Sequence, residues 1–302
     1  MKINCLIILS VILTLINAVL VVFIVLNVLS KDNCFITSER IIGGTTRSVR
    51  NYPFVAAVTE IVSDNILVFC GSSIVSTHWV ITAGHCVELL EEKEIDRLWI
   101  IANSNWWING TRHEVDKYDR YESIDIGLIR VVNPFTAHNE KPIPVAQSGY
   151  IYRPSTIVKI LGWGVLSSDY DIPSDELRGA ELRLLTHDDC RNIIEALKPD
   201  LDLPNITDKE FCAGPVNITA FQDSCYRDSG GPIVDGDLLI GFVARGPTKF
   251  KTRFKCGKGY PGIYVALWRC NEWIQEMEKH HNEKIVESFQ LTPNWISPSF
   301  WK

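Results

Sequence analysis

Three residue types that together could perform acyl-transfer chemistry occur in order along the chain. His85 lies in ITAGHC, Asp125 in SIDIGLIRV and Ser229 in RDSGGP. A serine hydroxyl is a weak nucleophile at neutral pH and needs a base beside it. A neutral imidazole can take the hydroxyl proton, and a carboxylate can hold the imidazole in the required tautomer. Each residue alone also fits a surface histidine, a turn aspartate or a loop serine, so the hypothesis requires that the three meet in space.

The elements that would position these residues are predominantly strands. From Ile41 onward, short runs rich in Val and Ile, such as WVITAG and IVKILGWG, are bounded by Gly, Pro, Asn and Asp. This alternation is typical of strands, and its density predicts an all-β barrel or sandwich. Helical spacing of apolar residues occurs over 188–198 and 267–282. The final stretch, 289–302, has no period and is predicted to be an extended tail.

Composition restricts the class of protein. The chain has 302 residues, of which 46% are hydrophobic, and a formal net charge of -6. It can therefore bury a sizeable core, and it shows no charge pattern that indicates nucleic-acid binding. No residue pattern indicates a metal site or a cofactor.

An apolar leader indicates export. The run over residues 3–29 is longer than a usual signal-peptide core of about 7–15 residues, and it reaches the roughly 20 residues that span a bilayer. Two alternatives remain: a cleaved signal peptide over 1–30, with secretion, or a retained N-terminal membrane anchor with the rest of the chain outside. Both place the remaining chain in an oxidising compartment. Three candidate glycosylation sites agree with this location: Asn109, Asn205 and Asn217.

Six short motifs occur in a fixed order between residues 41 and 280. They are IIGG, TAGHC, DIGL, GWG, DSC and DSGGP. In this order the chain resembles the chymotrypsin/trypsin family of serine peptidases. The resemblance implies two packed six-stranded β-barrels with a C-terminal helix, formed by residues 41–281 and followed by a tail over 282–302. It also implies that His85, Asp125 and Ser229 are the catalytic residues and that the substrates are proteins.

The resemblance implies synthesis as a zymogen. A trypsin-like activating protease would cut between Arg40 and Ile41 and release a short propeptide over 31–40. The new ammonium group of Ile41 would then pair with Asp228. A lone carboxylate taken into the interior costs several kcal/mol, so such a pairing could control the shape of the nucleophile loop.

The resemblance also implies a specificity and a class of inhibitor. Asp223 lies six residues before Ser229, at the position of the acid on the floor of the substrate pocket. Gly246 and Gly262 match the glycines of the pocket wall. A negative charge in a low-dielectric slot favours Arg or Lys at the residue before the cut. Serpin-type inhibitors are candidate partners.

Nine cysteines suggest a disulfide framework, and one of them, Cys5, lies in the leader. The family pattern implies Cys70–Cys86, Cys190–Cys212 and Cys225–Cys256. We predict that the two remaining cysteines, Cys34 and Cys270, form a fourth bond. That bond would keep the propeptide attached after cleavage.

Three positions depart from the family pattern. Arg227 replaces a Gly whose N–H, with that of Ser229, forms the oxyanion hole. A residue with a Cβ resists positive φ, so Arg227 either accepts a strained conformation, at about 1–3 kcal/mol, or its peptide flips. Ala244 replaces a Ser that helps to hold the catalytic Asp, and Arg245 replaces a Trp of the substrate channel. An added basic segment over 247–255 is either a contact surface or a solvated loop.

Two functions therefore remain. The first is an active trypsin-like endopeptidase of reduced or narrow activity. The second is a weakly active or non-catalytic homologue that acts by binding other proteins.

Overall fold

The computed structural model describes most of the chain after residue 40. The described residues are 15, 17–19, 41, 44–63, 65–121, 123–167, 170–197, 205–217, 222–246 and 260–287. The chain divides into two compact units, Met1–Ser38 and Glu39–Lys302. Among the described residues, no helix combines the length and the apolar character that a membrane crossing requires. Several residues with a predicted role lie outside the described residues, so what the sequence predicts for them stays a prediction. They are Cys34, Arg40, Cys256, the segment 247–255 and the tail beyond residue 287.

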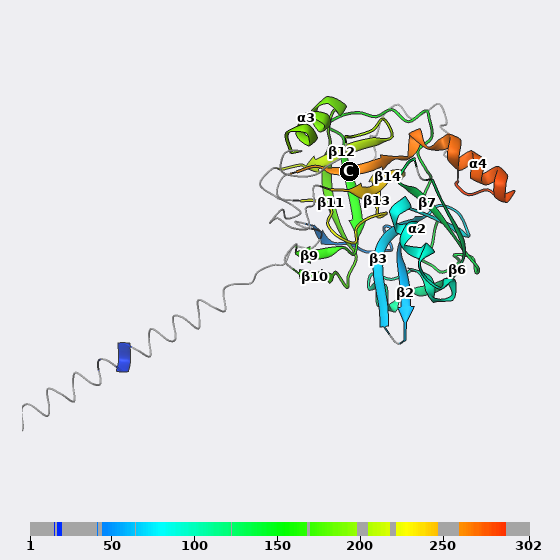
Figure 1. Ribbon diagram of the computed structural model, residues 1–302. Helices are drawn as coiled ribbons and strands as arrows, with labels where there is room; N and C mark the ends of the chain where they lie inside the picture. Colours follow the sequence, from blue (N-terminus) through cyan, green and yellow to red (C-terminus); the bar gives the residue numbers. More distant parts are fainter. Residues whose placement is uncertain are drawn as a thin grey trace, which may run out of the picture. The chain divides into compact units, whose positions relative to one another are not determined.

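The first half of Glu39–Lys302 forms a closed barrel of six antiparallel strands in the order β2-β3-β4-β7-β6-β5 (Figure 1). Runs of β-branched and apolar residues form its strands, and Trp79, Ile81 and Ile100 in them are fully buried. The strands are β2 (Val55–Val62), β3 (Asn65–Ile74), β4 (Trp79–Thr82), β5 (Leu98–Ala102), β6 (Thr111–Tyr121) and β7 (Ile126–Val131).

The second half forms another antiparallel barrel. Its strands run in the order β11-β12-β15-β14-β13-β8, and a further pairing of β11 with β8 closes the ring. The prediction of two six-stranded barrels is therefore confirmed. The strands are β8 (Ile157–Gly162), β11 (Arg178–Leu184), β12 (Glu210–Pro215), β13 (Pro232–Asp235), β14 (Leu238–Arg245) and β15 (Gly262–Ala266).

Three short strands lie outside the two rings. β1 (Thr45–Thr46) pairs with the first two residues of β11, so that the first residues of the domain are tied to the second barrel. β9 (Val165–Ser167) and β10 (Tyr170–Pro173) form a separate hairpin.

Helices are few. α2 (Gly84–Glu91) follows β4 and was not predicted, because its eight residues are too short to show a clear period. The two predicted helices are present as α3 (His187–Leu197) and α4 (Asn271–His281). The start of the predicted 267–282 helix is instead a 3-10 turn, η3 (Leu267–Arg269), and two other such turns are η1 (Ile95–Arg97) and η2 (Trp107–Asn109).

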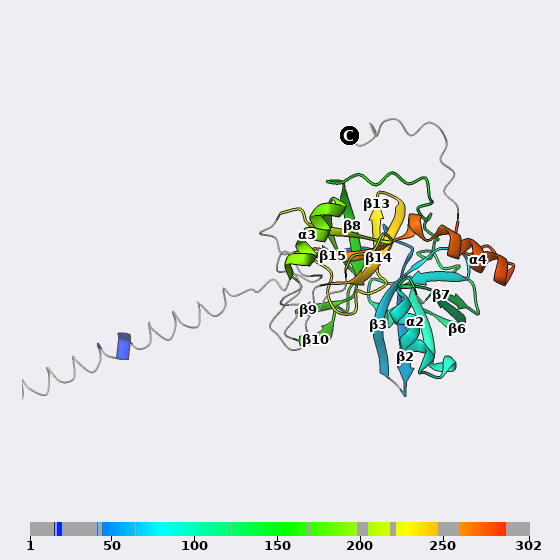
Figure 2. The same ribbon diagram turned by 45° about the horizontal axis from the view of Figure 1, so that its top comes forward.

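The C-terminal helix crosses from the second barrel to the first. α4 follows β15 of the second barrel but lies beside β6 and β7 of the first barrel in both views (Figures 1 and 2). Its last residue, His281, is 2.7 Å from a carboxylate oxygen of Asp119 in β6 and packs against the ring of Trp79. The helix therefore helps to hold the two barrels together.

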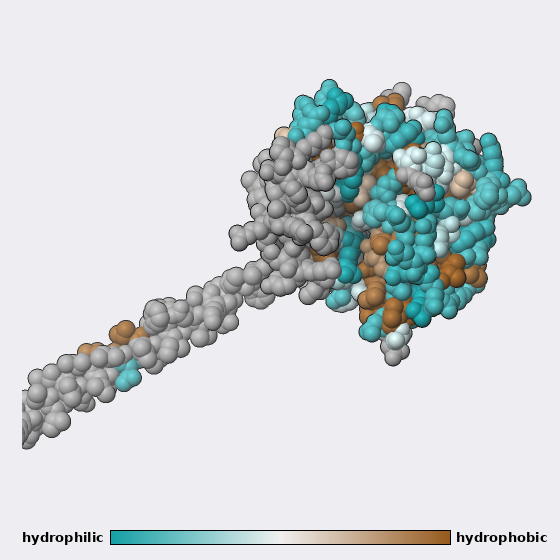
Figure 3. All heavy atoms as spheres, in the orientation of Figure 1, coloured by the Kyte–Doolittle hydropathy of each residue, from teal (hydrophilic) through white to brown (hydrophobic). Residues whose placement is uncertain are grey.

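Polar side chains dominate the described surface in the view of Figure 3. Apolar patches interrupt it, one of them over the β2–β3 hairpin, where Val62 and Leu67 are exposed. Scattered exposed apolar side chains of this kind are normal for a folded domain.

Candidate active site

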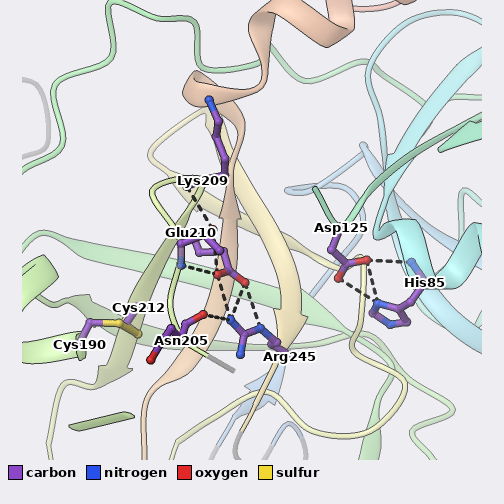
Figure 4. Close-up of polar contacts among 9 residues, drawn as sticks. His85, Asp125, Cys190, Asn205, Lys209, Glu210, Cys212 and Arg245 are labelled. Atoms are coloured by element: carbon purple, nitrogen blue, oxygen red, sulfur yellow. Dashed lines mark hydrogen bonds and ion pairs between the residues drawn. A yellow bond between two sulfur atoms is a disulfide. The ribbon is translucent and has the colours of Figure 1, made fainter. Parts of the chain in front are cut away.

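His85 and Asp125 lie side by side at one edge of the first barrel, just after the end of β4 and just before the start of β7. β4 pairs with β7, with Thr82 opposite Gly127, and His85 lies in the first turn of α2 directly after β4. One carboxylate oxygen of Asp125 accepts a hydrogen bond from the His85 backbone N–H at 2.8 Å, and both oxygens lie 3.0–3.1 Å from Nδ1 (Figure 4). If Nδ1 carries the proton toward this carboxylate, Nε2 remains as the free base.

The glycines of the two motifs make this approach possible. A Cβ added to Gly84 would lie 3.2 Å from a carboxylate oxygen of Asp125. A Cβ added to Gly127 would lie 2.4 Å from a methyl group of Val87 in α2. Small residues in TAGHC and DIGL therefore let helix α2 pack directly on β7.

The loop that carries Ser229 is hydrogen-bonded to the same edge of the first barrel. It lies between β12 and β13 of the second barrel, and the Ser229 carbonyl accepts from the N–H of Gly71 in β3 at 2.8 Å. Gly230 has a φ of 76°, and a Cβ there would lie 2.0 Å from the Thr82 hydroxyl oxygen. This close approach requires glycine after the serine.

The Ser229 side chain is half-buried and is not hydrogen-bonded to His85 in the structure. The structure thus pairs base and carboxylate and brings the serine loop to the same edge, but it leaves the serine–histidine bond unformed. Catalytic hydrogen bonds are often long or unaligned without substrate and tighten only in the complex.

The Asp125 carboxylate is partly exposed to solvent. Its side chain is 31% exposed, and that of His85 is 40% exposed. Ala244, the residue in place of the expected serine, is buried and has no hydroxyl to donate. Within the described part of the chain, His85 is therefore the residue that holds Asp125.

Arg227 takes the strained of the two predicted conformations. Its φ is 70°, in the left-handed region that favours glycine. Its guanidinium donates a hydrogen bond from Nη1 to the backbone carbonyl of Val68 in β3, at 2.7 Å.

Asp228 is buried inside the second barrel. It is 2% exposed, and its carboxylate accepts the N–H groups of Gly164 at 2.8 Å and Cys225 at 2.9 Å. Burial raises its pKa to about 7. A Cβ on Gly164 would lie 2.3 Å from the carboxyl carbon, which explains the second glycine of GWG. Ile41 is also buried, in the apolar cluster of this barrel.

Asp223 is buried, and its charge acts on the hydroxyl of Tyr264, the group that faces Gly262. It is 3% exposed and accepts the N–H of Ser224 at 2.8 Å. Burial, and then the charge of Asp223, raise the pKa of the Tyr264 hydroxyl. A Cβ on Gly262 would lie 2.7 Å from that hydroxyl, whereas a Cβ on Gly246 would meet open space.

The sequence did not reveal the partner of Arg245. At the end of β14, its guanidinium lies 3.0 Å and 2.9 Å from the two carboxylate oxygens of Glu210 and reaches the carbonyl of Asn205 at 3.3 Å (Figure 4). The pairing register places them together, because Arg245 lies opposite Ile263, which lies opposite Cys212, two residues after Glu210. Sequence spacing does not give this register.

Two predicted disulfides are confirmed, Cys70–Cys86 and Cys190–Cys212. Cys225 is also in a disulfide, and its predicted partner, Cys256, lies outside the described residues.

The predicted partner of Cys270, Cys34, lies outside the described residues, so the Cys34–Cys270 bond stays a prediction. Cys270 is a free thiol, 1% exposed, that donates to the carbonyl of Ala266 at 3.3 Å. Its side chain is packed inside the protein, and burial raises its pKa to about 12.

The three candidate glycosylation asparagines are exposed, as a modified side chain must be: Asn109, Asn205 and Asn217. Among the described residues, one potential metal-binding group outside a disulfide brings Asp119, His280 and His281 within 4.8 Å of one another. The ammonium of Lys117 lies 3.2 Å from Nδ1 of His281, which disfavours a cation there.

Comparison with known proteins agrees with this geometry. The family model described as Trypsin matches residues 41–274. Trypsin-1 of Salmo salar is 31% identical over 214 residues, covering 68% of this chain and 79% of its own length. Trypsin 5G1 of Aedes aegypti is 27% identical over 255 residues, covering 81% and 87%.

Two solved structures show the same fold. One is a scabies mite inactivated protease paralogue, S-I1, with a TM-score of 0.62 and 22% identity over 79% of this chain and 99% of that chain. The other is mouse neuropsin, a serine protease, with a TM-score of 0.63 and 24% identity over 78% and 98%. From the family match over most of the chain, with the pairing of His85 and Asp125, the chain belongs to the trypsin family of serine proteases.

Proposed function

We propose that the protein is a serine endopeptidase that is exported, made as a zymogen and specific for peptide bonds after Arg or Lys. The observation that carries the catalytic part is the pairing of His85 with Asp125 at the barrel edge to which the Ser229 loop is hydrogen-bonded. Trypsins among the relatives support the same activity for this chain.

The reaction follows from the roles of these groups. The hydroxyl of Ser229 attacks the substrate carbonyl and transfers its proton to Nε2 of His85, while Asp125 stabilises the imidazolium that forms. The backbone N–H groups of Arg227 and Ser229 stabilise the negative oxygen of the tetrahedral intermediate. The imidazolium then gives its proton to the leaving amine, and water releases the acyl group by the same steps.

Activation would use the buried site of Asp228. Cleavage after Arg40 frees an ammonium group on Ile41, a residue whose side chain is already buried in the same barrel. An ion pair with this ammonium would stabilise the ionised form of a carboxyl whose pKa burial otherwise raises to about 7. The residues after Asp228 would thereby be held in the catalytic conformation.

Specificity would come from Asp223. A buried carboxylate attracts a cationic side chain more strongly than a solvated one does, because the surrounding dielectric constant is lower. Its buried position, beside a wall that includes Gly262, supports a pocket for Arg or Lys. Protein substrates, a trypsin-like activator and serpin-type inhibitors are the partners that follow from this proposal.

A binding function is the second candidate. Arg227 in a left-handed conformation, Ala244 at the position where the family has a serine, and the unformed Ser229–His85 bond favour it. The fold does not decide between the two, because one structural neighbour is described as inactivated and another as a serine protease.

One experiment separates the two functions. The purified chain is cut after Arg40, confirmed by N-terminal sequencing, and treated with a fluorophosphonate probe, with Ser229→Ala as the matched control. Labelling of the cut protein and not of Ser229→Ala supports the peptidase. Absence of label on correctly cut, folded protein supports the binding function instead.

Localisation is tested separately. Secretion with removal of residues 1–30 predicts a mature protein that is soluble without detergent. A retained anchor predicts that the protein fractionates with membranes until detergent is added.

A further inference from the structure

The side chain of Arg227 connects the nucleophile loop of the second barrel to the first barrel. Its Nη1 donates to the carbonyl of Val68 at 2.7 Å, across the junction between the barrels. We propose that this contact is a strut that holds the backbone at residue 227 in its left-handed conformation, so that Arg227 is a positioning residue for its own backbone N–H. The catalytic consequence of the strut rests on the proposed function, but its effect on the fold does not.

The backbone at this position needs such support. A φ of 70° is unfavourable for every residue with a Cβ, and glycine adopts it freely. Strained conformations of this kind persist only where the surroundings over-determine them. An alanine at this position would keep the strain and lose the guanidinium, whereas a glycine would lose both.

The acceptor is suited to the strut. Val68 is 2% exposed and lies beside a bulge in the β2–β3 pairing, where Val58 is opposite Cys70 but Thr59 is opposite Val68. A bulge disrupts the ladder locally, so a carbonyl beside it can accept a donor from outside the sheet. A hydrogen bond from a guanidinium is charge-assisted and stronger than a bond between neutral groups.

The rest of the loop is held through its backbone and through Asp228. The Ser229 carbonyl accepts from Gly71, Gly230 donates to Val243 at 2.7 Å, and the Asp228 carboxylate accepts two N–H groups. Arg227 therefore adds a second tie from this loop to β3, two residues before the tie made by Ser229. The alternative is that the Arg227 side chain only obstructs the site.

Variants at position 227 distinguish a strut from an obstruction. In the cut protein, Arg227→Ala is expected to have a kcat at least about tenfold below the wild type, with KM little changed, because the N–H acts on the transition state. Arg227→Gly is expected to exceed Arg227→Ala by about tenfold, since glycine restores the conformation without a strut. Arg50→Ala, which removes an exposed arginine elsewhere, is the control for the loss of charge.

Inhibitor binding shows whether the effect is catalytic. Arg227→Ala should weaken a peptidyl aldehyde or boronate, which forms the tetrahedral adduct, by the same factor as kcat. Binding of benzamidine, which occupies only the Arg/Lys pocket, should not change. An Arg227→Ala variant as active as the wild type, or more active, would overturn the strut and establish obstruction.

Stability tests the strut even without catalysis. Arg227→Ala should lower the unfolding midpoint of the uncut chain by about 2–4 °C, since a domain of this size shifts by that amount for the loss of one such contact. Equal midpoints for Arg227→Ala and the wild type would refute the strut. If neither the wild type nor any variant is labelled at Ser229, but the unfolding midpoint of Arg227→Ala is still below that of the wild type, the proposed function fails while the strut stands.

Discussion

Two carboxylates, Glu140 on the loop after β7 and Asp228 on the loop before β13, are almost equally buried but have different partners. They are 4% and 2% exposed. Glu140 lies 3.0 Å from Nε2 of His113, a buried residue of β6, and also accepts the N–H groups of Thr136 and Ala137. Asp228 accepts two backbone N–H groups, and no described cation pairs with it.

The pKa values of the two groups move in opposite directions. Burial acts to raise the pKa of Glu140, but the hydrogen bonds from His113 and Ala137 outweigh it and the pKa is lowered. For Asp228, burial prevails over the two N–H bonds and raises the pKa to about 7. Glu140 has its partner within the folded chain, so the pair can contribute to stability. Asp228 has no described cation, which suits the proposed site that cleavage after Arg40 completes.

The largest expected effect is a loss of activity on substitution of Asp228 but not of Glu140. Asp228→Asn in the cut protein should lose at least about 100-fold in kcat/KM, comparable to the loss of an oxyanion donor, because no charge draws the new ammonium inward. Glu140→Gln should retain kcat once folded. Hydrolysis of a small Arg substrate, normalised to folded protein, measures both, and equal losses would contradict the contrast.

The next largest effect is a loss of stability on substitution of Glu140. Glu140→Gln should lower the free energy of unfolding by about 3–5 kcal/mol, because it removes the buried carboxylate charge that pairs with His113. Urea denaturation of the uncut chain measures this change. The double variant His113→Leu/Glu140→Leu should recover much of the loss, and a single variant as stable as the wild type would show that the pair contributes little.

A pH series distinguishes the uncut from the cut protein. The pKa of Asp228 in the uncut fold, about 7, is above its ordinary value of 3.8. The folded state therefore binds the proton more tightly, and this contribution to stability is lost as pH rises from about 4 to about 7.

Cleavage should abolish this loss, because the ammonium of Ile41 then stabilises the ionised form. The contribution of Glu140 has the opposite sign, because its pKa is lowered: it is present above pH 4.5 and is lost as pH falls. Unfolding midpoints of the uncut wild type and Asp228→Asn isolate the first effect. Parallel curves for these two proteins would contradict the assignment.

The smallest expected effect is the loss of stability when an exposed ion pair is broken, and it serves as the reference for the buried pair. Arg97 and Glu94 form an ion pair at 2.8 Å, with side chains 50% and 67% exposed. Glu94→Gln should change the free energy of unfolding by less than about 1 kcal/mol, because water screens the charges. A loss as large as that of Glu140→Gln would remove burial as the explanation for the difference.

Local sequence was informative where a residue's role depends on its neighbours in the chain. The runs of β-branched residues predicted an all-β barrel or sandwich, and the family resemblance implied two barrels. The helical spacing over 188–198 predicted α3. The glycines around His85 and Asp125 were visible as motifs. Their reason, the close packing of α2 on β7, appears only in the fold.

Three contacts between distant segments were not predicted. Arg245 with Glu210, His113 with Glu140, and Arg227 with Val68 each join segments whose pairing depends on strand register and barrel closure. Counting cysteines likewise did not show that the Cys270 side chain is buried and its thiol free.

By itself, the sequence determined the family, the candidate catalytic residues and the unusual arginine at position 227. Only the tertiary structure decided that this arginine adopts a positive φ and reaches β3, and that Asp228 lies buried without a described cation. The physical reason is that residue types set which interactions are available, while the energy of burial and of backbone strain depends on what the folded chain places around them.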